Sequence, residues 1–367
     1  MKEGHFSGLN VTIPYKKAVI PYLTELSPMA EKLGAVNTIV RRPDSTLWGH
    51  NTDAFGFRSM IEQGGFAVSG RKCLVLGSGG AGTMAAAVLE DLGAEVVIIS
   101  RSGENNYENL GRHADAAFIV NATPVGMAPS VGSAPVDLGL FPNLEGVLDL
   151  IYNPARTRLL LDAEARKIPT MNGLWMLVAQ AKEAAEHFTG CDIPDNVIPA
   201  IYKKLRLQME NILLIGMPGC GKSTIGRLLA EKLGKTFVDA DEEIIKLAGM
   251  SIPDIFAKEG EEGFRRYEST VLSDLGKRSG LVIATGGGCV TRPENYPALH
   301  QNGTIFRLHR DLDRLPTEGR PLSHADRLAE MFAVRDPLYA AFADHTVDNN
   351  GSTEETLTQI LTLLEAN

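Results

Sequence analysis

The chain has 367 residues, a length typical of two or three domains, and 44% of them are apolar, which suffices for ordinary hydrophobic cores. Its net charge of −9 excludes nucleic-acid binding through an overall basic surface, so an anionic substrate must be held by local arginine and lysine side chains. The four cysteines are scattered without a CxxC pair, so neither zinc nor a disulfide framework is expected. Because the sequence has no apolar signal core and no run of the ~20 apolar residues that a membrane helix needs, it predicts a soluble, cytoplasmic protein that binds neither nucleic acid nor membrane.

Predicted strands alternate with predicted helices along the chain. Apolar runs at 72–76, 95–100, 117–121 and 146–151 indicate buried strands of a parallel sheet, and amphipathic patterns at 155–167, 173–188 and 198–208 indicate helices. A second cycle starts with the strand 211–215 and continues with strands at 280–285 and 304–308. No flexible linker separates the two cycles, and we expect the boundary near Met209, where a helix runs into a strand.

A first glycine-rich loop follows the predicted strand 72–76. Gly77, Gly79 and Gly82 have the G-x-G-x-x-G spacing, which allows a tight turn and close approach of backbone N–H groups to a pyrophosphate, although a purely structural turn is the alternative. After the next strand, Arg101 stands where an NAD site would have an acidic residue. A guanidinium there favours the 2′-phosphate of NADP, the alternative being a solvated loop residue.

Five further motifs accompany this loop in a fixed order. They are Asn10-Val-Thr-Ile-Pro-Tyr-Lys16, Gly34-Ala-Val-Asn-Thr38, Asn51-Thr-Asp53, Asn121-Ala-Thr-Pro-Val-Gly126 and Gly173-Leu-Trp-Met-Leu-Val-Ala-Gln180. With these motifs, residues 6–205 resemble shikimate dehydrogenase. The resemblance implies a Rossmann-type NADP domain and NADP-linked interconversion of 3-dehydroshikimate and shikimate.

The resemblance also implies roles for individual residues. Lys16 and Asp53 would be the catalytic pair, and because an ionised Asp53 favours the charged ammonium, we interpret them as one coupled unit; a surface ion pair is the alternative. The substrate hydroxyls would be held by Thr12, Asn37 and Gln180, together with Asp53. The cofactor would contact Gly77, Gly79, Gly80, Gly82, Arg101, Asn121 and Thr123, with Met176 near the nicotinamide.

One part of the family pattern is absent from this sequence. Members of the family carry earlier strand–helix segments with a Ser-x-Ser motif that grips the substrate carboxylate, and no such motif stands upstream of Asn10. We therefore expect strand 9–13 to be an apolar edge without its sheet neighbour. We also expect this chain alone to retain NADP binding but to have severely reduced or absent dehydrogenase turnover. A non-catalytic NADP-binding module is accordingly an alternative for the first half.

A second glycine-rich loop, Gly216-Met-Pro-Gly-Cys-Gly-Lys-Ser-Thr224, follows the apolar strand 211–215 and matches the P-loop pattern in full. Backbone N–H groups of such a loop, here from Gly219, Gly221 and Thr224, cradle phosphates at the start of a helix. The pattern predicts that Lys222 reaches the β and γ oxygens of ATP and that the Ser223 hydroxyl ligates Mg²⁺.

Carboxylates and further glycines follow the P-loop. Asp239 and Asp241 end the next strand, where one can serve the metal and the other can orient an attacking hydroxyl, although Asp241 could also be a helix N-cap. Arg265 and Glu268 are three residues apart and share a helix face. The glycines 286–288 permit close backbone approach to a small ligand, or else form a plain turn.

The last motifs are a polar loop with Arg314 and Arg320, which is typical of a lid, and a segment beginning at Arg335, which we expect to open a helix. In this order, the motifs make residues 210–350 resemble shikimate kinase, which implies ATP-dependent phosphorylation of the shikimate 3-hydroxyl. The resemblance implies that Asp241 acts as a base at that hydroxyl and that Ser223 and Asp239 bind Mg²⁺. It implies that the substrate carboxylate is bound by Arg265, Arg335 and Gly287. Arg320 would lie over the phosphates and Arg314 near adenine, and Phe256 and Glu268 would surround the pocket.

The sequence thus predicts an α/β protein of three parts: a partial substrate lobe (1–55, completed by helices in 171–208), a Rossmann NADP domain (56–170) and a P-loop kinase domain of the nucleoside-monophosphate-kinase type (209–367). The expected small molecules are shikimate, 3-dehydroshikimate, NADP and ATP, because the dehydrogenase would make what the kinase consumes. A kinase for gluconate or a nucleoside monophosphate is the alternative, and the Asp239/Asp241 pair with Arg265 argues against it. No oligomeric state is predicted.

Overall fold

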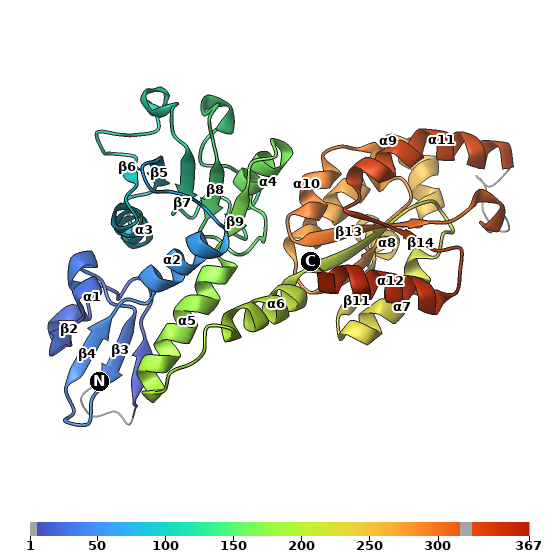
Figure 1. Ribbon diagram of the computed structural model, residues 1–367. Coiled ribbons are helices and arrows are strands. Elements are labelled where there is room, and N and C mark those ends of the chain that lie inside the picture. Colours follow the sequence, from blue (N-terminus) through green and yellow to red (C-terminus); the bar gives the residue numbers. More distant parts are fainter. Residues whose placement is uncertain (1–5, 316–324, 367) are drawn as a thin grey trace. The chain divides into compact units, whose positions relative to one another are not determined.

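The computed structural model describes residues 6–315 and 325–366, and the chain forms two compact units, residues 1–204 and 205–367 (Figure 1). The border between the units falls inside helix α6 (Val197–Met209). Among the described helices, none combines the length and the apolar character needed to cross a membrane.

The first unit begins with a small sheet of four strands in the order β1-β3-β4-β2. These strands are β1 (Gly8–Asn10), β2 (Glu25–Leu26), β3 (Thr38–Arg41) and β4 (Leu47–His50), and helix α1 (Pro28–Leu33) lies between β2 and β3 in the chain. β3 pairs antiparallel with both β1 and β4, and β2 pairs parallel with β4. Ala30, Val36, Ile39 and Leu47 form a compact core under this sheet.

The expected strand 9–13 is shorter in the structure, where β1 ends at Asn10 as the outermost strand of its sheet. The reason is a turn that begins at once: the backbone N–H of Tyr15 donates to the carbonyl of Thr12 over 2.9 Å. Pro14, inside this turn, has no N–H for a ladder bond. The Val11 N–H still donates to the Asn37 carbonyl over 2.7 Å, and the residues after Val11 leave the sheet and can carry side chains toward the site described below.

A second sheet of the first unit is entirely parallel, with the order β6-β5-β7-β8-β9. Its strands are β5 (Lys72–Leu76), β6 (Glu95–Ile99), β7 (Phe118–Asn121), β8 (Gly146–Asp149) and β9 (Thr170–Asn172). The accompanying helices are α2 (Asp53–Gln63), α3 (Gly80–Asp91), α4 (Arg158–Ala165) and α5 (Leu174–Thr189). α2 and α5 pack on each other between the two sheets, as Figure 1 shows.

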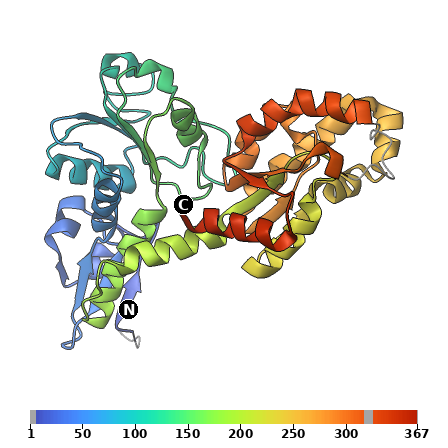
Figure 2. The ribbon, with the colours of Figure 1, turned by 45° about the vertical axis from the view of Figure 1, so that its right-hand side comes forward.

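The second unit is built on one parallel sheet with the order β11-β12-β10-β13-β14. The strands are β10 (Asn211–Ile215), β11 (Thr236–Asp239), β12 (Leu281–Ala284), β13 (Gly303–His309) and β14 (His345–Asp348). Helices α7 (Lys222–Leu233) and α12 (Thr353–Ala366) cover one face, and α9 (Ile252–Lys277), α10 (Asn295–His300) and α11 (Ala325–Phe342) cover the other (Figures 1 and 2). Helix α8 (Ala240–Ala248) directly follows β11.

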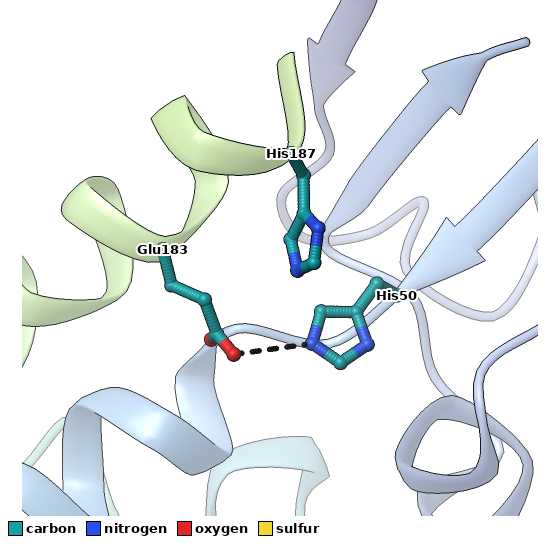
Figure 3. Close-up of side chains that lie close together, drawn as sticks. All are labelled: His50, Glu183 and His187. Atoms are coloured by element: carbon teal, nitrogen blue, oxygen red, sulfur yellow. Dashed lines mark hydrogen bonds and ion pairs between the residues drawn. The ribbon is translucent and has the colours of Figure 1, made fainter. Parts of the chain in front are cut away.

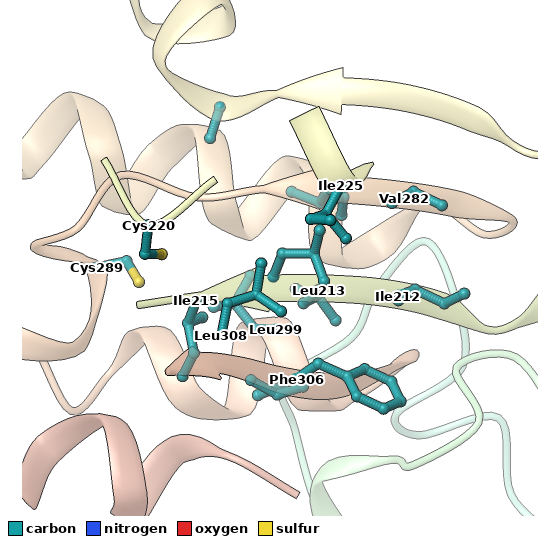
Figure 4. Packing of buried hydrophobic residues seen from close by; sticks show 14 of the residues in the cluster. Ile212, Leu213, Ile215, Cys220, Ile225, Val282, Cys289, Leu299, Phe306 and Leu308 are labelled. Atoms are coloured by element: carbon teal, nitrogen blue, oxygen red, sulfur yellow. The ribbon is translucent and has the colours of Figure 1, made fainter. Parts of the chain in front are cut away.

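The core of the second unit surrounds the central strand β10, every residue of which is buried. Figure 4 shows Leu213 and Ile215 of β10 among side chains from the neighbouring strands, including Val282 and Phe306. A strand buried on both faces is expected to be apolar throughout, as this one is between Ile212 and Ile215. Because parallel strands end at one edge, the loops after β10, β11 and β12 meet there.

Two expectations about helices need correction. The helix expected at 155–167 spans Arg158–Ala165, because Thr157 caps it by accepting a hydrogen bond from the Leu160 N–H. Arg335 does not open a helix but lies inside α11, with Pro337 also inside. A proline is common in the first turn of a helix, but Pro337 lies in the interior of α11. The carbonyl four residues earlier belongs to Ala333, which is exposed, so water can replace the lost N–H.

Candidate active sites

The first site joins Lys16 to Asp53, two residues 37 positions apart in the chain. The Lys16 Nζ donates to the Asp53 Oδ2 over 2.6 Å, and both side chains are only partly exposed, at 27% and 18%. Lys16 lies in the loop after β1, and Asp53 is the first residue of α2. The structure thus brings together the pair that the sequence singled out.

Asn37 holds the other oxygen of this carboxylate. Its Nδ2 donates to the Asp53 Oδ1 over 2.9 Å and to the Thr52 Oγ1 over 3.1 Å, while its Oδ1 accepts from the Thr52 N–H. The Thr52 hydroxyl in turn donates to the Gln180 Oε1 over 3.2 Å. Lys16, Asn37, Asp53 and Gln180 therefore form one polar cluster, organised around the buried Thr52, which the sequence analysis had not singled out. Thr12 is exposed in the turn after β1.

The glycine loop of the first unit lies between β5 and α3. A Cβ on Gly82 would stand 1.9 Å from the Gly77 carbonyl oxygen, so the helix can approach the strand this closely only with glycine at position 82. Gly77 itself has φ of 106°, which favours glycine, and Gly79 is the residue before α3. The first turn of α3, including Gly80, thus directs its N–H groups into an open loop suited to a pyrophosphate.

Asn121 and Thr123 lie beside this loop at the end of β7. The Asn121 Oδ1 accepts from the Thr123 N–H and hydroxyl, and the Thr123 methyl would be 3.1 Å from a Cβ on Gly77. Arg101 is exposed after β6, where its guanidinium is free to meet a phosphate. Met176 lies in the first turn of α5, half-buried.

Asp149, the last residue of β8, was not among the site residues predicted from the sequence. It is fully buried and accepts hydrogen bonds from the Asn121 Nδ2, the Thr157 hydroxyl at 2.7 Å and the Ile151 N–H. Burial raises the pKa of Asp149 to about 6, against the opposing effect of these donors. Asp149 fixes Asn121, so it positions the loop beside the glycines. A polar residue at the end of a buried strand was the signal that could have revealed it.

The P-loop of the second unit runs from β10 into α7. Lys222 is buried, and its Nζ donates to the carbonyls of Gly216 at 2.9 Å and Met217 at 3.0 Å. The Ser223 hydroxyl donates to the Asp239 Oδ2 over 2.7 Å. A hydroxyl and a carboxylate in contact at a P-loop are the donor set that Mg²⁺ prefers, so the residues fit that ion.

A cavity of about 520 Å³ opens at this edge of the sheet. It is lined by Pro218, Gly219, Gly221, Lys222, Ser223, Thr224, Asp239, Asp241, Thr285, Gly286 and Gly287. The P-loop, the carboxylates after β11 and the glycines after β12 therefore share one space. Asp239, not Asp241, is the N-cap of α8: its side chain accepts the Asp241 N–H, which leaves the Asp241 carboxylate beside the cavity as a helix residue.

Arg265 and Glu268 form a buried ion pair on α9, with the Arg265 Nη1 donating to the Glu268 Oε2 over 2.6 Å. The other terminal nitrogen of Arg265 donates to Glu261, whose side chain is 67% exposed. Burial raises the pKa of Glu268, while the positive charge of Arg265 opposes this effect. A Cβ on Gly288 would be 2.1 Å from the Arg265 guanidinium, so this glycine lets the side chain lie against the backbone.

Arg335 also reaches the glycine loop, donating from Nη1 to the Gly287 carbonyl over 3.1 Å. Tyr339, one turn later on α11, donates its hydroxyl to the same carbonyl and is fully buried. Arg314 lies apart from these residues and donates to the Asn350 carbonyl over 2.7 Å. Phe256 stacks on Phe264 with ring centroids 4.8 Å apart. Arg320 lies outside the described residues.

Comparison with known proteins relates each half of the chain to a different family. Residues 218–365 match the family model for shikimate kinase, and residues 1–39 match that for the shikimate dehydrogenase substrate binding domain. A shikimate kinase from Nitrosospira multiformis is 43% identical over 180 residues, which cover 46% of this chain and 92% of the relative. A shikimate dehydrogenase (NADP⁺) from Symbiobacterium thermophilum is 39% identical over 216 residues, covering 52% of this chain and 73% of the relative. The chain belongs to both families.

The protein is therefore a bifunctional shikimate-pathway enzyme, with a dehydrogenase unit (residues 1–204) and a kinase unit (residues 205–367). The fold of the dehydrogenase unit is similar to the shikimate 5-dehydrogenase of Thermus thermophilus, solved in complex with NADP(H) and shikimate. The two are 33% identical with a TM-score of 0.50, over 55% of this chain and 80% of that one. These comparisons favour neither a non-catalytic first half nor a kinase for a different hydroxyl substrate.

Proposed function

We propose that the kinase unit transfers the γ-phosphoryl group of ATP to the 3-hydroxyl of shikimate, at the cavity between the P-loop and the Gly286–Gly288 loop. The observation that carries this proposal is the cavity lining, which combines phosphate-binding backbone, Lys222 and the Asp241 carboxylate. Asp241 orients the attacking hydroxyl and accepts its proton, and Lys222 leaves its own loop carbonyls to stabilise charge on the phosphates. Ser223 and Asp239 would hold Mg²⁺, which neutralises phosphate charge when bound.

The substrate carboxylate is assigned to Arg265, Arg335 and the backbone at Gly287. Both arginines lie at the Gly286–Gly288 loop, as their contacts with Gly288 and Gly287 indicate. Their planar guanidiniums suit a carboxylate better than a point charge would. Arg314, held at the Asn350 carbonyl, is assigned to the adenine side.

For the dehydrogenase unit, we propose NADP-dependent interconversion of 3-dehydroshikimate and shikimate. NADP supplies the hydride acceptor for shikimate oxidation. The Lys16/Asp53 pair exchanges a proton with the reacting oxygen as one coupled unit, since the two groups contact each other directly. Thr12, Asn37 and Gln180 orient the ring hydroxyls. The cofactor is assigned to the Gly77–Gly82 loop, Arg101, Asn121, Thr123 and Met176, with Arg101 meeting the 2′-phosphate.

Paired assays on the purified full-length protein test both proposals. ADP release in the presence of ATP and Mg²⁺ should require shikimate and should not occur with gluconate or a nucleoside monophosphate. Chelation of Mg²⁺ should abolish this activity, and added Mg²⁺ should restore it. NADPH formation from shikimate is measured in the same preparation. Its rate, set beside that of the Symbiobacterium relative, also tests the sequence-based expectation of reduced turnover. ADP release that is indifferent to shikimate would contradict the kinase assignment.

A further inference from the structure

Three side chains with no role in the proposed reactions meet in the dehydrogenase unit: His50, Glu183 and His187 (Figure 3). His50 is the last residue of β4, and Glu183 and His187 are one turn apart on α5, so they share a helix face. One nitrogen or oxygen from each side chain lies within 4.8 Å of the others. As Figure 3 shows, the two elements direct all three side chains toward a common point.

Two polar atoms of this cluster are buried without a hydrogen-bond partner among the described residues. They are the Oε2 of Glu183 and the Nε2 of His187. Buried carboxylate and imidazole atoms are nearly always bonded to something, because water would otherwise solvate them better. Two such atoms on adjacent side chains indicate a ligand that accepts electron pairs from both.

His50 is already oriented for this role. Its Nδ1 lies 2.6 Å from the hydroxyl oxygen of Ser27, which also accepts the Ala30 N–H and is thereby fixed. A proton on Nδ1, donated to Ser27, leaves the lone pair of Nε2 for a metal ion, which is how protein histidines are commonly prepared for coordination. The His50 Nε2 stands 3.4 Å from the Glu183 Oε1. Ligand atoms about 2.0–2.1 Å from a tetrahedral zinc ion are about 3.3 Å apart, so this pair already has the required spacing.

The surroundings hold the cluster in place. The Trp48 ring stacks on His50 at 5.1 Å between centroids, and its edge contact with His187 is 5.0 Å. At the end of α5, the Phe188 ring lies against Gly8 of β1, so closely that a Cβ added to Gly8 would be 1.9 Å from the ring. The other nearby acid on α5, Glu186, is held by Lys182 at 2.8 Å and is therefore engaged elsewhere.

We propose that His50, Glu183 and His187 bind one Zn²⁺ ion in the dehydrogenase unit, with the fourth position taken by water. Two imidazoles and one carboxylate suit zinc, whereas Mg²⁺ and Ca²⁺ favour sites made of oxygen alone. The ion joins β4 to α5, and these elements also lead to Asp53, three residues after His50, and carry Gln180, three residues before Glu183. Bound zinc would therefore hold β4 and α5 together and stabilise the positions of Asp53 and Gln180 without contacting the substrate.

The test is zinc titration of the chelator-treated full-length protein by calorimetry, with reducing agent and excess Mg²⁺ present. The wild type should bind one tight zinc per chain. His187→Ala and Glu183→Gln should each lower the affinity by more than the ~100-fold that loss of a supporting hydrogen bond costs. The matched controls are His113→Ala, a histidine of the same unit bonded to Asn105 at 3.0 Å, and Glu186→Gln; both should bind as the wild type does.

Trp48 supplies a second readout, because it stacks on His50. Zinc should change the tryptophan fluorescence and raise the melting temperature of the wild type and both controls, but not of the two cluster variants, whose folding is checked by circular dichroism. Glu183→Gln keeps the size of the side chain, so it remains informative if His187→Ala unfolds. Wild-type zinc affinity in folded Glu183→Gln, or zinc binding that is lost in Cys191→Ser instead, overturns the proposal. The proposal is also overturned if the wild type binds no zinc, because the contact between His50 and Glu183 would then serve packing alone.

Discussion

The two units arrange their reactive charges in different ways. In the dehydrogenase unit, Lys16 and Asp53 contact each other directly, on segments that leave a small sheet of short strands. In the kinase unit, Lys222 is bonded to carbonyls of its own loop, and the carboxylates belong to a different strand end. The first arrangement is a pair whose members act together. In the second, the lysine is bonded within its own loop, and a ligand must join it to the carboxylates.

This difference has a physical origin in the two sheets. Parallel strands of the kinase unit all end at one edge, so three loops supply groups to one cavity, where Ser223 of the P-loop contacts Asp239 at the end of β11. The reactive pair of the dehydrogenase unit is instead fixed by side-chain contacts, through Asn37 and Thr52. We therefore expect single substitutions in the kinase site to remove separable functions, and substitutions at the dehydrogenase pair to disable it as a unit.

The largest effect is expected from Lys222→Ala. This change removes a buried positive charge beside the phosphates, and the loss of one such preorganised group costs up to about 10³-fold in rate. Shikimate-dependent ADP release should fall by that factor, whereas shikimate-dependent NADPH formation should not change. Lys232→Ala on the same helix, which removes only an exposed ion pair with Glu354, is the control and should leave both activities intact. An equal loss of both activities in Lys222→Ala would contradict the assignment of the two activities to separate sites.

Lys16→Met should disable the dehydrogenase unit. A positioned acid–base group contributes about 10²-fold or more, so kcat for shikimate oxidation should fall by at least that factor. The kinase rate, assayed in parallel, should stay unchanged. The neighbouring exposed Lys17 provides the matched variant, Lys17→Met, which should retain wild-type turnover. If Lys17→Met lost as much activity as Lys16→Met, the assigned pair would be wrong.

Protonation of Asp149 should make the free energy of unfolding of the dehydrogenase unit depend on pH. Burial raises its pKa from 3.8 to about 6, so the folded state holds this proton more tightly than the unfolded state does. The resulting stabilisation is complete below about pH 4 and is lost as the pH rises through about 6, a change of up to about 3 kcal/mol.

The measurement is urea unfolding at pH 4 and pH 7, comparing the wild type with Asp149→Asn, which does not titrate. Both tryptophans, Trp48 and Trp175, lie in the dehydrogenase unit, so their fluorescence follows that unit alone. The stability of the wild type relative to the variant should fall as the pH rises. A constant difference between the two proteins would mean that Asp149 has the same proton affinity in both states.

Arg265→Ala should have the smallest of these effects, confined to one substrate. Losing a charge-assisted hydrogen bond costs about 1.5–3 kcal/mol, so the KM for shikimate should rise about 10- to 100-fold while the KM for ATP stays the same. Arg266→Ala is the control, because the Arg266 side chain is 61% exposed and pairs with Glu259 away from the cavity. A defect in ATP binding alone would contradict the carboxylate-binding role.

Features set by neighbours in the chain could be predicted from the sequence. The strands 72–76 and 211–215 have the expected bounds, and both glycine loops follow them, because strand, turn and helix signals lie within a few residues. The start of α11 could not be placed from the residues around Arg335, because a proline is rare inside a helix and nothing local shows that α11 continues through Pro337.

Features set by distant contacts could not be predicted. Asp149 is recognisable as a polar residue at the end of a buried strand, but its partners Asn121 and Thr157 are known only once the chain has folded and brought them against it. His50 and Glu183 are separated by 133 positions, and neither belongs to a motif that names the other. The scattered cysteines led us to expect no zinc, and the zinc site proposed above uses instead histidines and a glutamate that meet only in the folded chain.

Gly286 has a consequence for the genetics of this enzyme. A Cβ at that position would lie 2.9 Å from the Glu268 Oε1 and 3.0 Å from the Asp241 Oδ1, between two carboxylates of the kinase site. Every codon change that replaces glycine adds at least that carbon. In a saturation library selected in a host that depends on this kinase, position 286 should therefore tolerate few substitutions. Gly111 should accept many, because a Cβ there would meet nothing within 4 Å and its φ is not positive.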